Sequence, residues 1–366
     1  MINKRQAIFI IFLCALSTKL QRLPNLVCVM AGQDGWIVLL ICAILDCLMI
    51  WLAIWFFKKH NKLKEGAFVV LKTSMGNFFA RFLYFFVAVY FMAKTVLPFE
   101  AIRELFSSIL FDKVNYVYFG ILFLAVVIFV VNRGLRTIGR EAEIYMPLVS
   151  IGVVGILILG LTSTDFSRVL PFFNTKANVI ASEVLKCSPW FGDYIILFIL
   201  TGFVDIKQGE KMGLNVFFAY FCAIFLITPL FCACFYGLYG NVVGYQTNAI
   251  SSLTQFSLLE LDIGRVDYFL VLFEQISTIV SASAYLYFAS MCFCKAFNIT
   301  KIVWVALVVG TINYLLDIFV FRNASSSAIG YRDVLYIFML IINFAVPLIF
   351  IISSAIFLRK KKAPNV

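Results

Sequence analysis

Long apolar runs recur along the entire chain, and they constrain its fold more than any other feature of the sequence. A run of about 18 residues or more can cross the hydrocarbon core of a bilayer as a helix. With 63% of its 366 residues hydrophobic, the chain is too apolar for a soluble domain. The sequence therefore predicts an all-α membrane protein with about ten transmembrane helices, near residues 6–30, 36–57, 77–99, 115–132, 140–162, 189–206, 213–237, 266–292, 300–320 and 333–358.

The lysine and arginine residues indicate how these helices are oriented. A formal net charge of +11 would suggest a nucleic-acid partner in a soluble protein, but here the cations lie in short connections between apolar runs. Placing the N-terminus inside puts most of them in cytoplasmic connections, as the positive-inside rule requires. We therefore expect a multi-pass cell membrane protein with both termini in the cytoplasm and with no nucleic-acid partner.

The first apolar run is interrupted near its middle. Lys19, Arg22 and Pro24 fall at the depth of the hydrocarbon core, where a proline-broken helix is tolerated only if its backbone faces protein or water. Discontinuous helices at this depth form the substrate sites of many secondary transporters. We therefore place the centre of a binding site here, with a simple proline kink and snorkelling cations as the alternative. Beyond the interruption, Asp34 can cap the next helix.

Ten spans divide naturally into two groups of five. Because each group has an odd number of spans, the second group is inverted in the membrane relative to the first. We predict one membrane domain over 1–366, built from a five-helix repeat at 6–162 and an inverted repeat at 189–358.

The start of the sixth span has the features of a second break. Pro189, Gly192 and Asp193 occur together there, so spans one and six form the broken pair expected of an inverted repeat. The preceding outer connection, 164–188, contains an amphipathic piece around 177–185. That piece could cover the outer side of the site or could be an ordinary loop.

The eighth span carries a polar stripe. Glu274, Ser277, Thr278, Ser281 and Tyr285 recur at helical spacing on an otherwise apolar segment, so they share one face of the helix. In a bilayer this face must meet protein or water. It could bind a small cation or a polar ligand, or it could form hydrogen bonds to a neighbouring helix.

The cations of the first span require counter-charges. Unpaired Lys19 and Arg22 would each cost about 2.5–3.5 kcal/mol on insertion scales, and the candidate partners for pairing or ion coupling are Asp193 and Glu274. The Lys19 ammonium could occupy the place of a coupling sodium ion between the first and eighth helices. This hypothesis predicts a carrier or sensor that works without sodium.

Two other spans contain polar residues at membrane depth. Tyr90 and Lys94 are four residues apart and share one face of the third span, where Lys94 could pair or couple to an ion or could snorkel outward. Asp46 in the second span is interpreted as a structural partner of a neighbouring helix. Asp317 lies near a span end, where a structural role is also favoured.

The sequence offers little for catalysis or for a metal. The only histidine, His60, lies in a charged connection, and the ten cysteines fall mostly inside apolar runs where they suit packing. No triad or metal-ligand spacing can be assembled from them. We therefore expect no enzyme activity, no metal and no cofactor.

Several stretches taken together resemble a known family, the GerAB-type spore germination permeases of the amino acid, polyamine and organocation transporter superfamily. The order and spacing of these stretches cover most of the chain. They are Leu23-Pro24 followed by 31–36, then 132–140 leading into Glu143 and Pro147, then Val169-Leu170-Pro171, the broken sixth span, and Arg265-Val266-Asp267.

The resemblance implies a LeuT-like fold of ten helices with broken helices one and six. It also implies the membrane subunit of a nutrient germinant receptor in the inner membrane of the spore, beside an A-type membrane subunit and a C-type lipoprotein. Such subunits sense small germinants such as amino acids. The alternative is a transporter of an amino acid or amine, with Glu274 or Asp193 as the candidate residues for proton coupling. The pocket implied by the fold comprises Thr18, Lys19, Gln21, Arg22, Tyr90, Trp190, Gly192, Asp193, Ser277 and Ser281.

Two departures from the family pattern bear on the ligand. Lys19 and Arg22 stand near the proline of the first span, where the family commonly has small residues and glycine. In the sixth span, Gly192-Asp193-Tyr194 replaces the usual order of glycine, aromatic residue and glutamate. Both departures make an anionic ligand conceivable.

Overall fold

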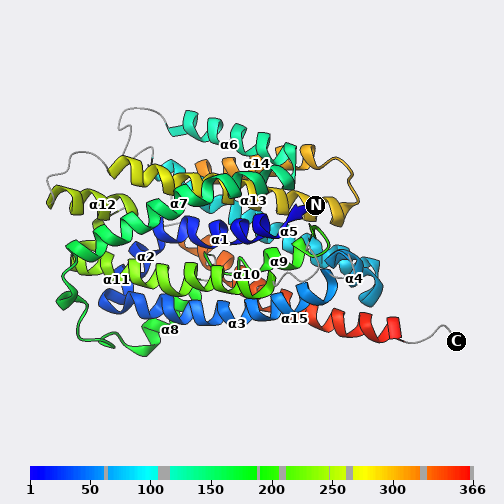
Figure 1. Cartoon of the computed structure of the whole chain (residues 1–366), viewed down its shortest axis with the longest axis horizontal. Coiled ribbons are helices and arrows are strands. Elements are labelled where there is room, and N and C mark those ends of the chain that lie inside the picture. The colour runs from blue at the N-terminus through cyan, green and yellow to red at the C-terminus, as the bar shows by residue number, and fades with distance from the viewer. Residues whose placement is uncertain are drawn as a thin grey trace.

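The chain is described by a computed structural model that covers residues 1–61, 65–105, 116–187, 190–205, 212–246, 248–260, 267–321 and 328–362. These parts are helical almost throughout, and the helices run roughly along the longest axis of the molecule (Figure 1). A two-residue strand, β1 (Ile2–Asn3), pairs in parallel with β2 (Val204–Asp205). The predicted all-α class is confirmed.

Each predicted span overlaps a helix of the described chain. The first half contains α1 (Lys4–Gln21), α2 (Leu23–Ala31), α3 (Gly35–Asn61), α4 (Ala67–Met75), α5 (Asn77–Leu105), α6 (Tyr116–Arg133) and α7 (Leu135–Ser163). The second half contains α8 (Ala177–Lys186), α9 (Ile195–Leu200), α10 (Met212–Phe221), a π-helical turn at Cys222–Ile227, α11 (Thr228–Tyr239), α12 (Ala249–Glu260), α13 (Asp267–Phe297), α14 (Ile302–Leu316) with a π-helical end at Asp317–Phe321, and α15 (Ala328–Lys362). Short 3-10 turns lie at Gly32–Asp34, Phe166–Val169 and Gly240–Tyr245.

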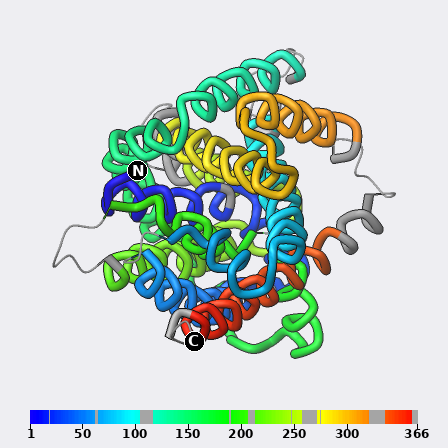
Figure 2. Tube along the Cα trace, turned by 90° about the vertical axis from the view of Figure 1, so that its right-hand side faces the viewer, coloured from blue at the N-terminus to red at the C-terminus, as the bar shows by residue number. Residues whose placement is uncertain are grey.

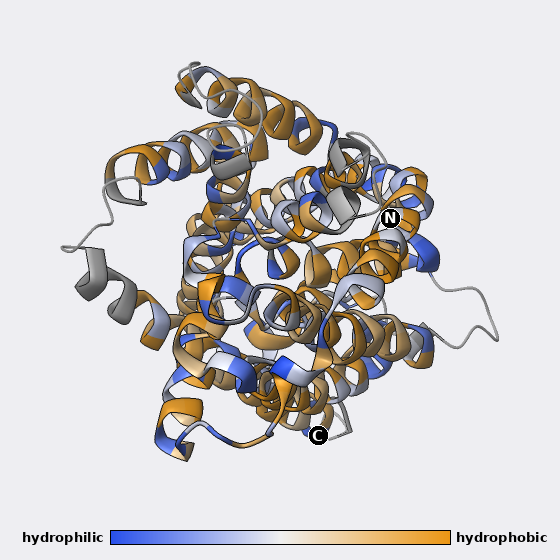
Figure 3. Ribbon diagram, turned by 90° about the vertical axis from the view of Figure 1, so that its left-hand side faces the viewer, coloured by the Kyte–Doolittle hydropathy of each residue, from blue (hydrophilic) through white to orange (hydrophobic). Residues whose placement is uncertain are grey.

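The length and composition of the helices fit a membrane. In the described part of the chain, seven helical stretches are long and apolar enough to cross one. The segment α1 falls outside this group because Lys4, Arg5 and Lys19 make it too polar by composition. Hydrophobic residues predominate along most of the helices (Figure 3). Many large apolar side chains are exposed, among them Trp51, Phe78 and Trp304. The chain is therefore a multi-pass membrane protein whose outward faces suit lipid.

The first predicted break is confirmed at Arg22. Its backbone angles, φ −121° and ψ −33°, depart from helical values and separate α1 from α2. Pro24 lies in the first turn of α2, where its missing N–H is tolerated. A proline that would disrupt a continuous helix therefore starts a new one.

The second break lies inside the sixth helical unit, with helix on both sides. We expected the interruption at the beginning of a span over 189–206, but α8 precedes it and only Ile195–Leu200 is helical after it. The amphipathic piece expected around 177–185 is α8, but we placed it in the connection before the span because its ten residues are too few, and with Asn178, Glu183 and Lys186 too polar, for a span. The residue bounds of the two repeats, 6–162 and 189–358, stay a prediction.

The N-terminal strand and the C-terminal end of α15 lie toward the same end of the bundle, the end that also carries α4, whereas α8 and α12 lie at the opposite end (Figure 1). Asn61 fixes the C-terminal end of α3 to this first end by donating to the Val204 carbonyl at 3.0 Å, next to the strand that holds Ile2. An even number of membrane crossings requires such an arrangement. That this end faces the cytoplasm stays a prediction.

The centre of the bundle is formed around α13. This helix packs against α1, α5, α7 and α14, and Figure 2 shows the N-terminal helix enclosed by later segments. The polar stripe of the eighth span faces inward: Ser277, Thr278, Ser281 and Tyr285 are all buried. The site described next lies where this stripe meets the two breaks.

Candidate functional site

A buried carboxylate, Asp193, lies at the centre of the candidate site. The Lys19 ammonium is 2.5 Å from its Oδ2 atom and the Lys94 ammonium is 2.6 Å from its Oδ1 atom. The Tyr285 hydroxyl donates to the same Oδ1 at 2.7 Å. Each of the four side chains is at most 2% exposed. Two cations and a phenol therefore share one anion in an environment where charge is strongly unfavourable unless it is paired.

Four separate elements bring this cluster together. Lys19 comes from the last turn of α1, where a cation is favoured by the helix dipole. Lys94 comes from α5, Asp193 from the break before α9, and Tyr285 from α13. Tyr285 also contacts the Cys14 carbonyl of α1 at 3.0 Å. The pairing of Lys19 with Asp193, one of the two expected partners, is present in the structure.

A second carboxylate, Asp46, holds the backbone of the break. The Gly192 N–H lies 3.1 and 3.2 Å from its two oxygens, and the Tyr220 hydroxyl donates to Oδ2 at 2.5 Å. On the other side, Tyr90 contacts the carbonyls of Phe191 and Gly192 at 3.2 Å each. Side chains of α3 and α5 therefore bind the unwound segment, and Tyr220 of α10 binds Asp46. Asp46 has the structural role that we expected.

Gly192 is required by both its conformation and its surroundings. Its φ of +86° lies in the region that favours glycine. A Cβ atom at this position would collide with Oδ1 of Asn343 and with the hydroxyl of Tyr90. The break can therefore pack closely against α5 and α15 only because residue 192 has no side chain.

The polar stripe of α13 meets the end of α1. The Gln21 amide donates to the Thr278 hydroxyl at 2.9 Å, and Ser281 donates to the Thr278 carbonyl at 3.0 Å. Ser277 is buried on the same face. Three of the residues implied by the family resemblance thus lie together, and Thr278 joins them as a direct partner of Gln21.

Arg22 belongs to a different ionic network, which sequence reasoning missed. It forms an ion pair with Glu100 of α5. Arg103, one turn further along α5, lies 3.9 Å from Glu100 and contacts both oxygens of Asp317 at 3.1 Å. The i,i+3 spacing of Glu100 and Arg103 was the available signal. We expected Arg22 to pair with Asp193 or Glu274, but the structure pairs it with Glu100.

The structure does not describe every predicted site residue. Pro189 and the side chains of Thr18 and Glu274 lie outside the described residues. Trp190 is buried at the start of the second break. Among the described residues, no group of three His, Cys, Asp or Glu side chains could hold a metal ion. The cations described next to Asp193 are the ammonium groups of Lys19 and Lys94.

Asp34 has a role other than the predicted helix cap. Its two carboxylate oxygens accept from the backbone N–H groups of Phe173, at 2.8 Å, and Thr175, at 2.7 Å. The Thr175 hydroxyl donates a hydrogen bond to the Ala31 carbonyl at 2.8 Å. The turn after α2 is thereby fixed to the connection between α7 and α8.

Two broken helices packed around a central polar cluster define a multi-pass membrane protein with the LeuT-like transporter fold. The chain belongs to the spore germination protein family, which its sequence matches over residues 1–326. No curated protein sequence matches the chain. The family resemblance inferred from the sequence is confirmed, and the protein is not an enzyme.

Solved structures of transporters share the fold. MhsT in complex with L-phenylalanine is similar with a TM-score of 0.66 and 14% identity, over 96% of this chain and 87% of MhsT. A Na⁺-coupled sialic acid symporter gives 0.64 and 15%, over 97% and 79% of the two chains. Mhp1, a nucleobase-cation-symport-1 family transporter with bound bromovinylhydantoin, gives 0.60 and 14%, over 86% and 71%.

Proposed function

We propose that this protein is the membrane subunit of a nutrient germinant receptor, and that it binds a small nutrient, an amino acid, between the two helix breaks. The observation that carries the proposal is the Asp193 cluster. Its bonds join α1, α5 and α13 to the second break. Any ligand that competes for these groups changes how four elements are held together, which is what a conformational sensor requires.

The chemistry of the cluster indicates the ligand class. An amino acid carries a carboxylate, which Lys19 or Lys94 can bind, and an ammonium group, which Asp193 can bind. The uncharged neighbours Gln21, Thr278 and Ser281 provide hydrogen-bonding groups beside these charges. Ligand binding would shift the protein only through a difference in affinity between two conformations. The exchange of internal ion pairs for ligand contacts supplies such a difference.

We further propose that the response passes to an A-type membrane subunit and a C-type lipoprotein in the inner membrane of the spore, with both termini of this chain in the cytoplasm. The concentration of lysine and arginine in the predicted cytoplasmic connections supports this orientation. Protease digestion of a C-terminal tag in inside-out and right-side-out vesicles tests the orientation directly.

Dose–response curves of germinating spores test the binding site. Ser281→Ala removes a hydroxyl beside the cluster, and loss of one hydrogen bond of about 0.5–1.5 kcal/mol corresponds to roughly a 2- to 10-fold rise in the germinant concentration needed. Ser150→Ala is the matched control, because Ser150 also donates to its own helix, at 2.8 Å from Met146, but lies on α7. The site would be refuted if both substitutions raised the required germinant concentration equally, or if neither changed it.

Transport of the same ligand is the alternative function, favoured by the similarity to solved symporters. Vesicles that contain only this chain distinguish the two functions. Accumulation of labelled amino acid against a gradient would establish a carrier. Ligand binding without accumulation, with a response only after co-expression of the partner subunits, would establish a receptor.

A further inference from the structure

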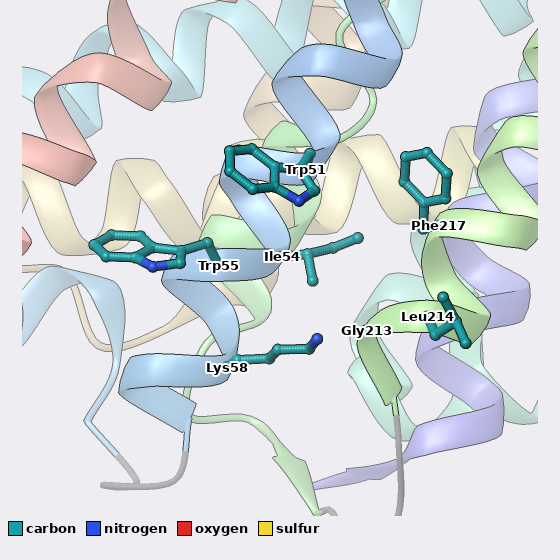
Figure 4. Close-up of a pocket in the computed structure, with 7 residues that line it drawn as sticks. All are labelled: Trp51, Ile54, Trp55, Lys58, Gly213, Leu214 and Phe217. Carbon is teal, nitrogen blue, oxygen red and sulfur yellow. The ribbon is translucent and has the colours of Figure 1, made fainter.

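A second candidate site lies away from the central cluster, in a cleft between α3 and α10 (Figure 4). The cleft has a volume of about 350 Å³. It lies toward the end of the molecule that carries β1 and the C-terminal end of α15, because Lys58 is only one turn before the end of α3. The cleft is lined by Trp51, Ile54, Trp55 and Lys58 of α3 and by Gly213, Leu214 and Phe217 of α10.

Gly213 makes room for the Lys58 side chain in this cleft. A Cβ atom at residue 213 would collide with Cε of Lys58 and would lie 2.7 Å from its ammonium nitrogen. Figure 4 shows Lys58 extending from α3 toward Gly213. Among the described residues Lys58 forms no salt bridge, whereas neighbouring Lys59 lies 4.2 Å above the ring of Trp55. The cleft therefore has a cation at one end.

The rest of the cleft is apolar and open to the lipid side of the bundle. Trp51, Trp55 and Leu214 are 63%, 40% and 53% exposed, so the groove is bordered by side chains that water would not favour. Tryptophan is enriched at the boundary between hydrocarbon and headgroups. The apolar part of the cleft matches the acyl chains of a phospholipid, and the lysine at its end matches the phosphate of the headgroup.

The surrounding charge selects an anionic headgroup. The last turn of α3 contains two lysines, Lys58 and Lys59. Each basic residue near a membrane surface contributes about 1 kcal/mol of attraction to anionic lipid. A zwitterionic headgroup would gain little from this charge, because its own cation offsets the phosphate.

We propose that the cleft between α3 and α10 binds one anionic phospholipid, with its phosphate on Lys58 and an acyl chain along Trp51 and Phe217. The same two helices are joined deeper in the membrane by the 2.5 Å hydrogen bond from Tyr220 to Asp46. A lipid that spans the cleft therefore reinforces a pair of helices that holds the second break. Anionic lipid is expected to stabilise the arrangement of the second break that this structure shows.

Native mass spectrometry of the purified full chain tests this site with phosphatidylglycerol and phosphatidylcholine as probes. We expect the wild-type protein to retain at least one phosphatidylglycerol and to bind phosphatidylcholine at least about fivefold more weakly, a difference of roughly 1 kcal/mol. Lys58→Gln is expected to abolish this preference. Gly213→Ala, which displaces the lysine ammonium from the cleft, is expected to reduce it. Lys72→Gln, at an exposed lysine of α4, is the matched control and should leave it unchanged.

Three results would overturn the proposal. One is equal retention of the two lipids, and another is a preference that survives Lys58→Gln. The third is competition by inorganic phosphate at millimolar concentration, which would mean that the site recognises a free anion and not a lipid. Unfolding temperatures in phosphatidylcholine alone show whether each variant is folded, and a folded Lys58→Gln variant that keeps the lipid preference counts against the site.

Discussion

Lys19 and Asp193 are separated by 174 residues in the chain, yet the Lys19 ammonium and the Asp193 carboxylate are 2.5 Å apart and almost completely buried. Each residue lies at a helix interruption, Lys19 just before the break at Arg22 and Asp193 within the break before α9. The ion pair therefore connects the two interruptions directly. Lys94 shares the same carboxylate, so the anion serves two cations and its loss affects both.

Removal of Asp193 is expected to destabilise the protein more than removal of either lysine. Asp193→Asn leaves two buried ammonium groups without a counter-charge, whereas Lys19→Gln leaves the Lys94–Asp193 pair in place. Breaking a buried pair costs about 3–5 kcal/mol. We expect the loss of unfolding free energy in Lys19→Gln to lie at or below the lower end of this range. Thermal unfolding in detergent measures the order. Equal unfolding temperatures for the two variants would contradict the shared-anion arrangement, and Lys72→Gln controls for loss of a lysine.

Gly192→Ala is expected to disrupt the second break. Gly134 provides a control because its φ of +85° nearly equals the +86° of Gly192, but a Cβ atom there would meet nothing within 4 Å. Gly134→Ala should show only backbone strain of about 1–3 kcal/mol. Gly192→Ala adds a collision with Tyr90 and Asn343, worth about 1–3 kcal/mol more. Unfolding measurements on the two variants would show equal losses if the crowding around residue 192 were unimportant.

Asp34→Ala is expected to release the connection between α7 and α8 while the bundle remains folded. The substitution leaves the N–H groups of Phe173 and Thr175 without their carboxylate, at about 1–3 kcal/mol for the unsatisfied donors. Limited proteolysis should then cut within 164–176 faster than in the wild-type protein. Asp165→Ala is the control, because Asp165 contacts only its local turn through Ser167 and Arg168. Cleavage at the wild-type rate in Asp34→Ala would show that the contact does not hold the connection.

The charges of Arg22 and Glu100 are expected to be interchangeable only as a pair. Arg22→Glu or Glu100→Arg alone places like charges together in a partly buried network, whereas the double reversal restores one attraction. A double-mutant cycle on unfolding free energy should give a coupling of about 0.5–3 kcal/mol. Because Arg103 also approaches Glu100, the double variant should recover only part of the stability. Additive losses would show that the two residues are not coupled.

The helices could be predicted from the sequence because hydrocarbon accepts only segments that satisfy their own backbone. The first break was predictable for the same reason: Lys19 and Pro24 are incompatible with a continuous lipid-exposed helix. The cost of burying an unpaired charge predicted that Lys19 would pair with Asp193 or Glu274, and the structure shows the pair with Asp193. In each case the bilayer imposes a strong constraint on a single segment, and the constraint can be recognised without knowing how distant segments pack.

The remaining features depend on how helices are rotated and placed against one another. Nothing near Glu100 in the sequence identifies Arg22 as its partner, and Lys94 could equally have snorkelled away from Asp193. The amphipathic character of α8 was visible in the sequence, but its position directly before the second break was not, because a helix this short has no hydropathy signal of a membrane span. Asp34 was assigned to a local cap because its partners, Phe173 and Thr175, are about 140 residues away.

Ligand affinity is expected to be the same with and without sodium. In this structure the Lys19 and Lys94 ammonium groups already provide the positive charge beside Asp193, next to the Tyr285 hydroxyl of α13. A sodium ion at this place would be repelled by two cations, so it cannot contribute to ligand binding there. Binding of a labelled amino acid to the purified protein in sodium chloride and in choline chloride, at equal ionic strength, measures the effect. We expect dissociation constants within about twofold, and a loss of about tenfold or more in choline, roughly 1.4 kcal/mol, would show that a sodium site exists and that the lysines do not replace it.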